Sequence, residues 1–274
     1  MSAQTLSRPT GLSVVIPSLN RLEMVTRACQ SVVTQQTHRV EIIVIDDGSS
    51  EDLRPQLPEY NDHGIVIRSF RFERNRGPQA ARNLGIRRAR YSHIAFLDSD
   101  DAFTPDKIDL VLETLDKEPI DLLFHGVQGM PKYGRLANLW TKSLSRWLPF
   151  DWWLALLNPV VTPALVIRRE RRLGVTRLRH AEDWAYLLRY VQPDTRICYL
   201  PMELTVVFRR AGSTGGLSGA IWKMRKGEFA ARKVLLKQPW PTGLIRFVLG
   251  GCAGILRISS DVLRGRYFRG TGNS

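Results

Sequence analysis

The chain has 274 residues, of which 43% are hydrophobic, and a formal net charge of +14 at pH 7. This size and apolar content fit one large α/β domain with appendages, or two small domains, around a sizeable core. Its three cysteines lie far apart without a CxxC pair, which excludes a disulfide framework or a cysteine-rich zinc site as the organising element. The positive charge is uneven: residues 209–274 hold 13 Lys and Arg against two acids, or +11, which leaves +3 for residues 1–208.

Short apolar strands and helical patterns alternate along residues 12–125. No apolar run long enough for a signal peptide precedes them, so we expect a cytoplasmic protein. Asn20 can cap the first helix, with Glu23 at the capping-box position, and Gly77-Pro78 predicts a loop that closes at a helix N1 proline. Strands are expected at 12–16, 40–45, 65–70, 93–97 and 121–125. The alternation predicts an α/β fold with a doubly wound, mostly parallel sheet and helices on both faces.

The pattern changes after residue 125. Residues 126–160 are rich in Trp, Leu and basic residues and predict loop and short helix. We expect them beside the crevice at the carboxyl ends of the strands, where open α/β sheets bind ligands. A strand over 162–169 and a helix over 180–191 follow. The segments RICYLP and LTVVFRR then predict two further strands.

The basic C-terminal segment predicts two amphipathic helices. In 219–237, Trp222, Phe229 and Leu236 recur every seven residues with Lys and Arg between them. Residues 244–263 are long enough to span a bilayer, but Arg246 and Arg257 would each cost at least ~2.5 kcal/mol near its centre. An in-plane helix at a membrane interface and a helix packed on the protein's own core both stay open.

Three carboxylates lie within four residues in FLDSDD, just after the strand expected at 93–97. Like charges so close repel one another unless a cation is present, and Mg²⁺ or Mn²⁺ held jointly with a diphosphate would supply one. Such an ion assists a departing nucleoside diphosphate as a Lewis acid. Acidic turns that only cap helices are common, so the motif alone leaves both interpretations open.

Two other acidic motifs lie at element ends. Asp46-Asp47-Gly48-Ser49 follows a strand, where a carboxylate can accept a hydrogen bond from a nucleobase or ribose, and Gly48 allows a ligand to approach; an Asx turn is the alternative. Glu182-Asp183-Trp184 opens a helix, where a carboxylate stays ionised and can serve as a general base; simple first-turn capping is the alternative.

The order VVIPSLNR, IIVIDDGSSED, NRGPQAARNLGIRRARYSHIAFLDSDDAFTPDKI and AEDW resembles the family 2 inverting glycosyltransferases of GT-A fold. The likeness runs over about 12–190 and implies a glycosyltransferase domain over 1–208. Its nucleotide-sugar half would be 12–125 and its acceptor half 126–208, followed by a basic helical extension over 209–274. Leu19 departs from the family's opening motif, which often has an aromatic residue there, so the identity of the base stays open.

The resemblance also implies roles for individual residues. Asp47, with Asp46 nearby, would contact the base, and Pro17 would line the base pocket. Asp98 and Asp100 would form the DxD pair, with Asp98 towards the ribose or sugar and Asp100 towards Mg²⁺ or Mn²⁺. Asp183 would be the catalytic base, and Glu182 its substitute. Arg82 or Arg76 are candidates to assist at the phosphates, while His125 and His180 are interpreted as structural.

These motifs predict transfer of a sugar from a nucleoside-diphosphate sugar to an acceptor hydroxyl. The four tryptophans of 140–153 and the basic tail favour a saccharide or lipid-linked saccharide acceptor of envelope polysaccharide synthesis, with contact to an anionic membrane through 219–274. A nucleic-acid-binding protein is the second hypothesis, but no reader motif or zinc spacing supports it. A catalytically silent scaffold of a membrane polysaccharide complex is the third, against which all three acidic motifs argue.

Overall fold

A computed structural model describes residues 9–33, 39–57, 65–169, 181–208 and 221–263. The chain divides into two compact units. The first contains residues 1–135, 160–172 and 195–208, and the second contains residues 136–159, 173–194 and 209–274. The helices of the C-terminal segment therefore group with helices from the middle of the chain.

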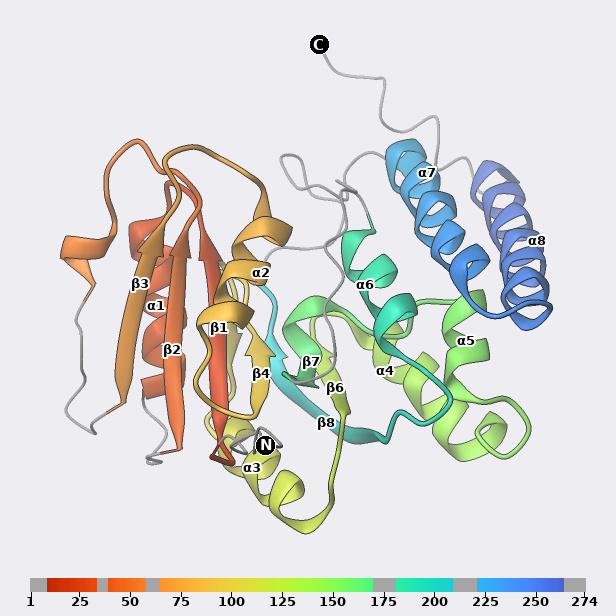
Figure 1. Ribbon diagram of the computed structural model, residues 1–274, viewed down its shortest axis with the longest axis horizontal. Helices are drawn as coiled ribbons and strands as arrows, with labels where there is room; N and C mark the ends of the chain where they lie inside the picture. Colours follow the sequence, from red (N-terminus) through yellow and green to blue (C-terminus); the bar gives the residue numbers. More distant parts are fainter. Residues whose placement is uncertain (1–8, 34–38, 58–64, 170–180, 209–220, 264–274) are drawn as a thin grey trace, which may run out of the picture. The chain divides into compact units, whose positions relative to one another are not determined.

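An eight-stranded mixed sheet forms the centre of the first unit, in the order β3-β2-β1-β4-β7-β6-β8-β5. Figure 1 shows β3, β2, β1 and β4 side by side, and these four strands pair in parallel. The β6–β8 pair is also parallel, whereas β4–β7, β6–β7 and β5–β8 are antiparallel, so four of the seven pairs are parallel. The strands are β1 Leu12–Ser18, β2 Val40–Asp46, β3 Val66–Arg71, β4 His93–Phe96, β5 Ala102–Phe103, β6 Leu122–Gln128, β7 Leu165–Arg168 and β8 Ile197–Val206.

Helices cover both faces of this sheet, as predicted. On β1, Val14 and Ile16 belong to one core with the apolar residues of α1 and α3. Val15 points the other way, because the side chains of a strand alternate, and a Cβ on Gly85 of α2 would lie 2.3 Å from its Cγ1. The helices of the first unit are α1 Leu22–Val33, η1 Arg54–Gln56, α2 Pro78–Arg88, α3 Lys107–Lys117 and η3 Thr162–Ala164.

Two local predictions were wrong and one was confirmed. The expected strands RICYLP and LTVVFRR are one strand, β8, because Pro201 lies where the β6–β8 register shifts and an irregular ladder needs no regular N–H donor. Asn20 does not cap α1, because its own backbone is left-handed (φ 54°) and its side chain bonds elsewhere. Helix α2 does begin at Pro78, directly after Gly77.

The second unit is helical. Trp184 of α6 is buried, and its indole Nε1 donates to the Leu154 carbonyl of α5 at 2.8 Å. Helix α8 packs against both α5 and α7. The helices outside the first unit are α4 Pro131–Leu139, which crosses the boundary, then η2 Trp140–Leu144, α5 Phe150–Leu156, α6 Glu182–Tyr190, α7 Ile221–Arg232, η5 Lys233–Lys237 and α8 Thr242–Leu263.

Candidate active site

The acidic motifs of the first unit leave the sheet at one edge. Strand β1 lies between β2 and β4, and all three run parallel. The register places Ser18 opposite Asp46, and Val15 opposite Phe96, so the loops after these strands start at the same side of the sheet. In open α/β sheets, ligands bind at this carboxyl edge. Buried Pro17 lies in β1 opposite Ile45, one residue before that edge.

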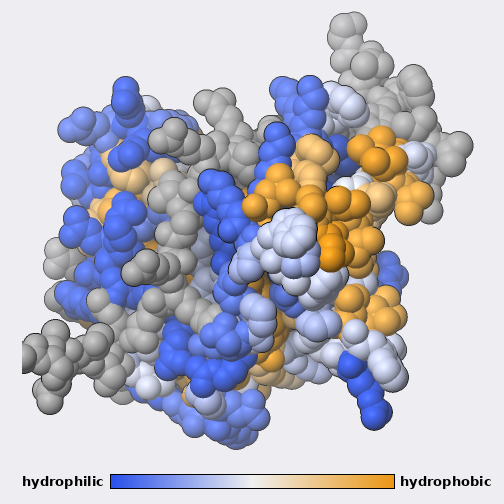
Figure 2. Space-filling model, turned by 45° about the vertical axis from the view of Figure 1, so that its right-hand side comes forward, coloured by the Kyte–Doolittle hydropathy of each residue, from blue (hydrophilic) through white to orange (hydrophobic). Residues whose placement is uncertain are grey.

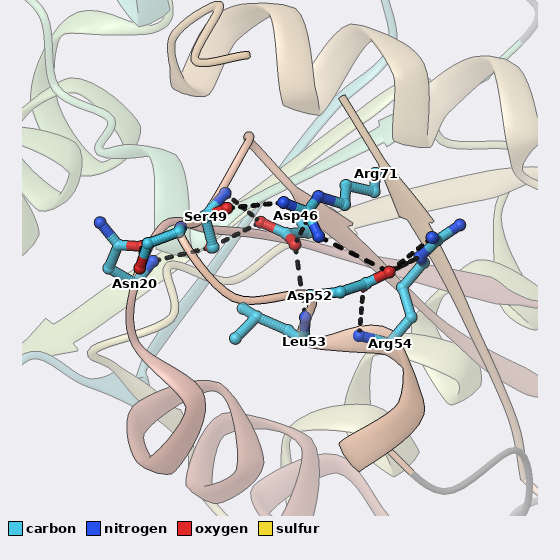
Figure 3. Close-up of polar contacts among 8 residues, drawn as sticks. Asn20, Asp46, Ser49, Asp52, Leu53, Arg54 and Arg71 are labelled. Carbon is cyan, nitrogen blue, oxygen red and sulfur yellow. Dashed lines mark hydrogen bonds and ion pairs between the residues drawn. The ribbon is translucent and has the colours of Figure 1, made fainter. Parts of the chain in front are cut away.

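The Asp46 carboxylate holds its own loop together. One oxygen accepts hydrogen bonds from the backbone N–H of Ser49 at 2.9 Å and from its hydroxyl, as Figure 3 shows. The other oxygen accepts from the Leu53 N–H at 3.4 Å and lies 3.6 Å from Arg71 Nε. Asn20 extends this network, because its side-chain oxygen accepts from the Ser50 N–H at 2.8 Å. The hydrogen bonds of Asp46 thus fix the conformation of this loop.

Asp47 links this loop to the one before α2. Its two carboxylate oxygens accept hydrogen bonds from the backbone N–H groups of Arg76 at 2.8 Å and Gly77 at 2.9 Å. Burial raises the pKa of Asp47, and these two hydrogen bonds oppose that rise. Gly48, with φ 80°, has a role that the sequence did not indicate: a Cβ there would lie 2.5 Å from the Arg74 carbonyl carbon, so glycine lets the two loops touch.

Each carboxylate of the DxD pair contacts an arginine. Asp98 bonds to Nη2 of Arg82, which is buried in α2. Asp100 lies 3.0 Å from Nη1 of Arg21, and its backbone carbonyl accepts from Arg27 at 2.9 Å. Arg82 therefore reaches the acidic turn, whereas the Arg76 guanidinium lies 4.8 Å from the ring centroid of Phe72. Arg21 and Arg27 were missed by the sequence reasoning, since no local pattern marks a partner more than 70 residues away.

The chemistry of this turn fits a divalent cation held jointly with a diphosphate. Within the described ranges, no three His, Cys, Asp or Glu side chains gather into a group that could hold a metal alone. Asp98 and Asp100 offer hard oxygen ligands, and Mg²⁺ commonly takes one or two carboxylates together with phosphate oxygens. Burial and the charges of Asp98 and Asp100 raise the pKa of Asp101 to about 8. Extra positive charge would relieve this excess of negative charge.

A buried lysine in α3 is a second feature that the sequence reasoning missed. Lys107 is fully buried, and its Nζ donates to the Pro163 carbonyl and the Thr205 hydroxyl, both at 3.0 Å. Burial lowers the pKa of Lys107, while the charge of Asp101 opposes that shift. Nothing in its local sequence distinguishes it from an exposed lysine on the surface of a helix.

Asp183 lies in the second unit, at the start of α6. One of its carboxylate oxygens accepts from the Trp184 N–H at 2.7 Å. Trp184 anchors this end of the helix, because its ring is buried and the Arg232 guanidinium of α7 lies 4.3 Å from the ring centroid. Of Glu182 the structure describes the backbone alone, and His180 lies outside the described residues.

One histidine and two tryptophans of this part of the chain are buried or make hydrogen bonds within the fold. His125 is buried, and its Nδ1 lies 2.7 Å from the Gly126 carbonyl. Trp140 donates to the Leu148 carbonyl at 2.8 Å, and Trp153 is buried. Trp147, in contrast, is 82% exposed.

A sheet of this topology, with acidic turns at the carboxyl ends of β2 and β4, defines a GT-A-type glycosyltransferase fold. The chain belongs to glycosyl transferase family 2, whose model matches residues 13–160. It is 42% identical over 115 residues to an uncharacterized glycosyltransferase of Rickettsia felis, across 42% of this chain and 19% of the relative. It is 28% identical over 149 residues to the succinoglycan biosynthesis protein ExoO of Rhizobium meliloti, across 54% and 42%. The chain thus spans about a fifth and about two fifths of the lengths of these relatives.

Solved structures share the fold. TarS residues 1–349 of S. aureus, in complex with UDP-GlcNAc, superposes with a TM-score of 0.62 at 18% identity, over 85% of this chain and 68% of TarS 1–349. The mannosyltransferase PcManGT of Pyrobaculum calidifontis, in complex with GDP-Man and Mn²⁺, superposes with a TM-score of 0.60 at 16% identity, over 94% and 81%. Because the match to PcManGT covers 94% of this chain, the shared fold extends into the helical C-terminal region.

Proposed function

We propose that this glycosyltransferase moves a sugar from a nucleoside-diphosphate sugar to an acceptor hydroxyl with inversion, and that it requires a divalent metal. The observation that carries the proposal is the meeting of Asp98 and Asp100 with Arg82 and Arg21 at the edge of the sheet where Asp47 also lies. Acids and arginines together suit a ligand that brings both a diphosphate and a cation. TarS with UDP-GlcNAc and PcManGT with GDP-Man and Mn²⁺ support this choice of donor class.

The nucleotide is assigned to the edge of β1 and β2. Asp47 keeps hydrogen-bonding capacity, because each of its oxygens accepts one backbone N–H in the protein alone and has a second lone pair. Asp47 would accept a hydrogen bond from the nucleobase, which would lie beside Pro17. Asp46 would act through the loop that it shapes, since its oxygens already accept from Ser49 and Leu53.

The diphosphate is assigned to the acidic turn. Asp98 and Asp100 would hold Mg²⁺ or Mn²⁺, which when bound neutralises the negative charge of the leaving nucleoside diphosphate. Arg82 would add positive charge at the phosphates, and its pairing with Asp98 keeps the guanidinium at this turn. Arginine is suited to this role because its planar guanidinium matches phosphate oxygens and stays charged.

Asp183 would accept the proton of the acceptor hydroxyl. The hydroxyl oxygen then forms a bond to the anomeric carbon from the face opposite the leaving group, the bond from that carbon to the phosphate oxygen breaks, and nucleoside diphosphate departs. The buried Trp184 would hold the start of α6 in place for this step.

For the acceptor we propose a saccharide or lipid-linked saccharide of envelope polysaccharide synthesis, used at the cytoplasmic face of the plasma membrane. The likeness to ExoO, named for succinoglycan biosynthesis, supports a polysaccharide product. The exposed apolar side chains of α7 and α8 support a reaction near lipid.

The test is release of nucleoside diphosphate from a panel of nucleotide sugars, with and without Mn²⁺ or Mg²⁺, together with donor binding by calorimetry. We expect metal-dependent turnover that Asp100→Ala lowers by about 10²-fold or more, because metal assistance contributes several kcal/mol. Asp183→Asn should lower turnover by about 10²- to 10⁴-fold while donor affinity stays the same. Asp116→Asn, at an exposed ion pair with Arg39, is the matched control and should change neither. Absence of donor binding in the wild type would refute the proposal and favour a silent scaffold.

A further inference from the structure

Helix α8 has the reverse of the usual polarity of a surface helix. Six large apolar side chains on one face are 43–72% exposed: Leu244, Ile245, Val248, Leu249, Ile255 and Leu256. The opposite face, which packs on the protein, carries glycines and the buried charged residues Arg246 and Asp261. Water-exposed helices normally place charge outside and apolar residues inside. The arrangement in α8 is that of a helix whose outer face contacts an apolar partner and not water.

The charges on the inner face are neutralised within the second unit. Arg246 lies 3.1 Å from Asp151 of α5 and also donates to the Asp151 carbonyl. Asp261 accepts from Arg225 of α7 at 3.1 Å, and Arg225 also contacts Glu228 at 2.6 Å. A charged arginine is costly when it enters the apolar part of a membrane. This cost does not apply to Arg246, because its charge faces the protein and is paired with Asp151.

Glycines fix which face of α8 points outward. A Cβ on Gly243 would lie 2.3 Å from the Leu235 carbonyl oxygen, and one on Gly250 would lie 2.5 Å from the Ala155 carbonyl oxygen. Because only glycine permits this approach, α8 cannot rotate its apolar face inward without a clash. Among the described residues, α8 is the helix long and apolar enough to cross a membrane. Its inner face is occupied by α5 and α7, which favours a helix lying in the plane of a membrane surface.

Helix α7 continues this surface with aromatic and basic side chains. Trp222 and Phe229 are about half exposed, and the Phe229 ring contacts Phe247 of α8 at a centroid distance of 5.7 Å. Figure 2 shows several groups of apolar side chains in orange, with paler and blue side chains between them. The exposed lysines of α7 and η5 are Lys223, Lys226, Lys233 and Lys237. Both acids within residues 221–263, Glu228 and Asp261, are buried, so the exposed charges of this segment are all positive.

We propose that the exposed face of α7 and α8 docks on an anionic lipid bilayer, with the apolar side chains of α8 inserted at the interface and the lysines of α7 and η5 on the lipid headgroups. Anionic headgroups match the lysines, and tryptophan is favoured at such interfaces. A second copy of the chain is a poorer occupant. A twofold interface would place the same surface against itself, and the lysines would meet no exposed acid there.

The test is flotation of the full chain with vesicles of phosphatidylcholine and phosphatidylglycerol, compared with vesicles of phosphatidylcholine alone. We expect binding to the anionic vesicles that Ile255→Asp/Leu256→Asp lowers by at least about tenfold, because two inserted side chains are replaced by charge. Each Lys→Gln change at Lys223 or Lys226 should lower binding about fivefold, and added salt should abolish that difference. Leu139→Asp, a change of an exposed apolar residue outside α7 and α8, is the matched control and should bind like the wild type.

Two outcomes would overturn the docking proposal. One is equal flotation of the wild type and Ile255→Asp/Leu256→Asp. The other is no binding to anionic vesicles, together with a dimer in light scattering that the same double variant converts to monomer, which would assign the surface to a second copy. Flotation requires no turnover, and donor binding in solution requires no membrane. Failure of the docking proposal and failure of the proposed reaction can thus be distinguished, and circular dichroism of each variant reports whether it folds.

Discussion

The two compact units bury carboxylates in different ways. In the first unit, Asp46 ends β2 and Asp47 follows it, and both carboxylates accept hydrogen bonds from backbone N–H groups of loops. In the second, Asp261 and Glu228 lie between helices, and the Arg225 guanidinium satisfies both. Loop amides bind an anion without adding a charge of their own, and Asp46 in addition lies 3.6 Å from Arg71. In the second unit, Arg225 and Arg257 together balance the charges of Glu228 and Asp261, which leaves the outer face of the helices to apolar side chains.

Among the variants that test this comparison, removal of Arg225 should lower the free energy of unfolding most. Arg225→Met leaves Glu228 with the longer 3.5 Å contact to Arg257 and leaves Asp261 without its ion pair to Arg225. We expect a loss of about 3–5 kcal/mol in the free energy of unfolding, measured by urea denaturation. The double variant Arg225→Met/Asp261→Leu should recover part of the loss, because it also removes one of the two buried carboxylates that the single variant separates from Arg225. A loss below about 1 kcal/mol for the single variant would show that the buried pair contributes little.

Asp46→Asn should have a smaller effect in the first unit. The amide keeps the size of the side chain, but it removes the charge that faces Arg71 and turns one acceptor into a donor. We expect a loss of about 1–3 kcal/mol in the same denaturation experiment. Asp116→Asn, whose exposed pair with Arg39 should contribute about 0–1 kcal/mol, is the reference. Equal losses for the two variants would contradict a loop-shaping role for Asp46.

His125 offers a third case, in which burial favours the uncharged form. Its pKa lies well below 6.5, first because of burial and then because of the charge of Lys107. Below about pH 6.5 the unfolded state takes up a proton that the folded state does not, so stability falls with falling pH. We expect about 1.4 kcal/mol less stability from this residue at about pH 5.5 than at neutral pH. Thermal or urea unfolding of His125→Gln should show a shallower pH dependence than the wild type, and identical slopes would refute the assignment.

The order of elements could be predicted because it follows from local patterns. Apolar runs gave β1, β2, β3, β4 and β6, and the proline after Gly77 gave the start of α2. The merged strand β8 could not be predicted, because whether Pro201 ends a strand depends on the ladder of β6, some 75 residues away. Asn20 was misjudged for a similar reason, since its partner is Ser50 on another loop.

The candidate site shows the same division. Asp47, Asp98 and Asp100 follow strands directly, so the position of each could be predicted from its own segment. Arg21 and Lys107 depend on contacts across the fold, and the sequence offers no sign of them. In α8, Arg246 and Arg257 share one face, because residues at this spacing align along a helix. That this face is the inner one depends on Asp151, 95 residues away.

The orientation of α8 makes one of the three cysteines suitable for selective labelling. Cys29 is buried, and burial raises its pKa to about 12; Cys198 is half-buried, and burial raises its pKa too. Cys252 lies on the exposed face of α8 between Leu249 and Ile255. A maleimide-linked fluorophore should therefore label this thiol selectively in the natural sequence. The label would report solvent polarity at the surface in question without an engineered substitution.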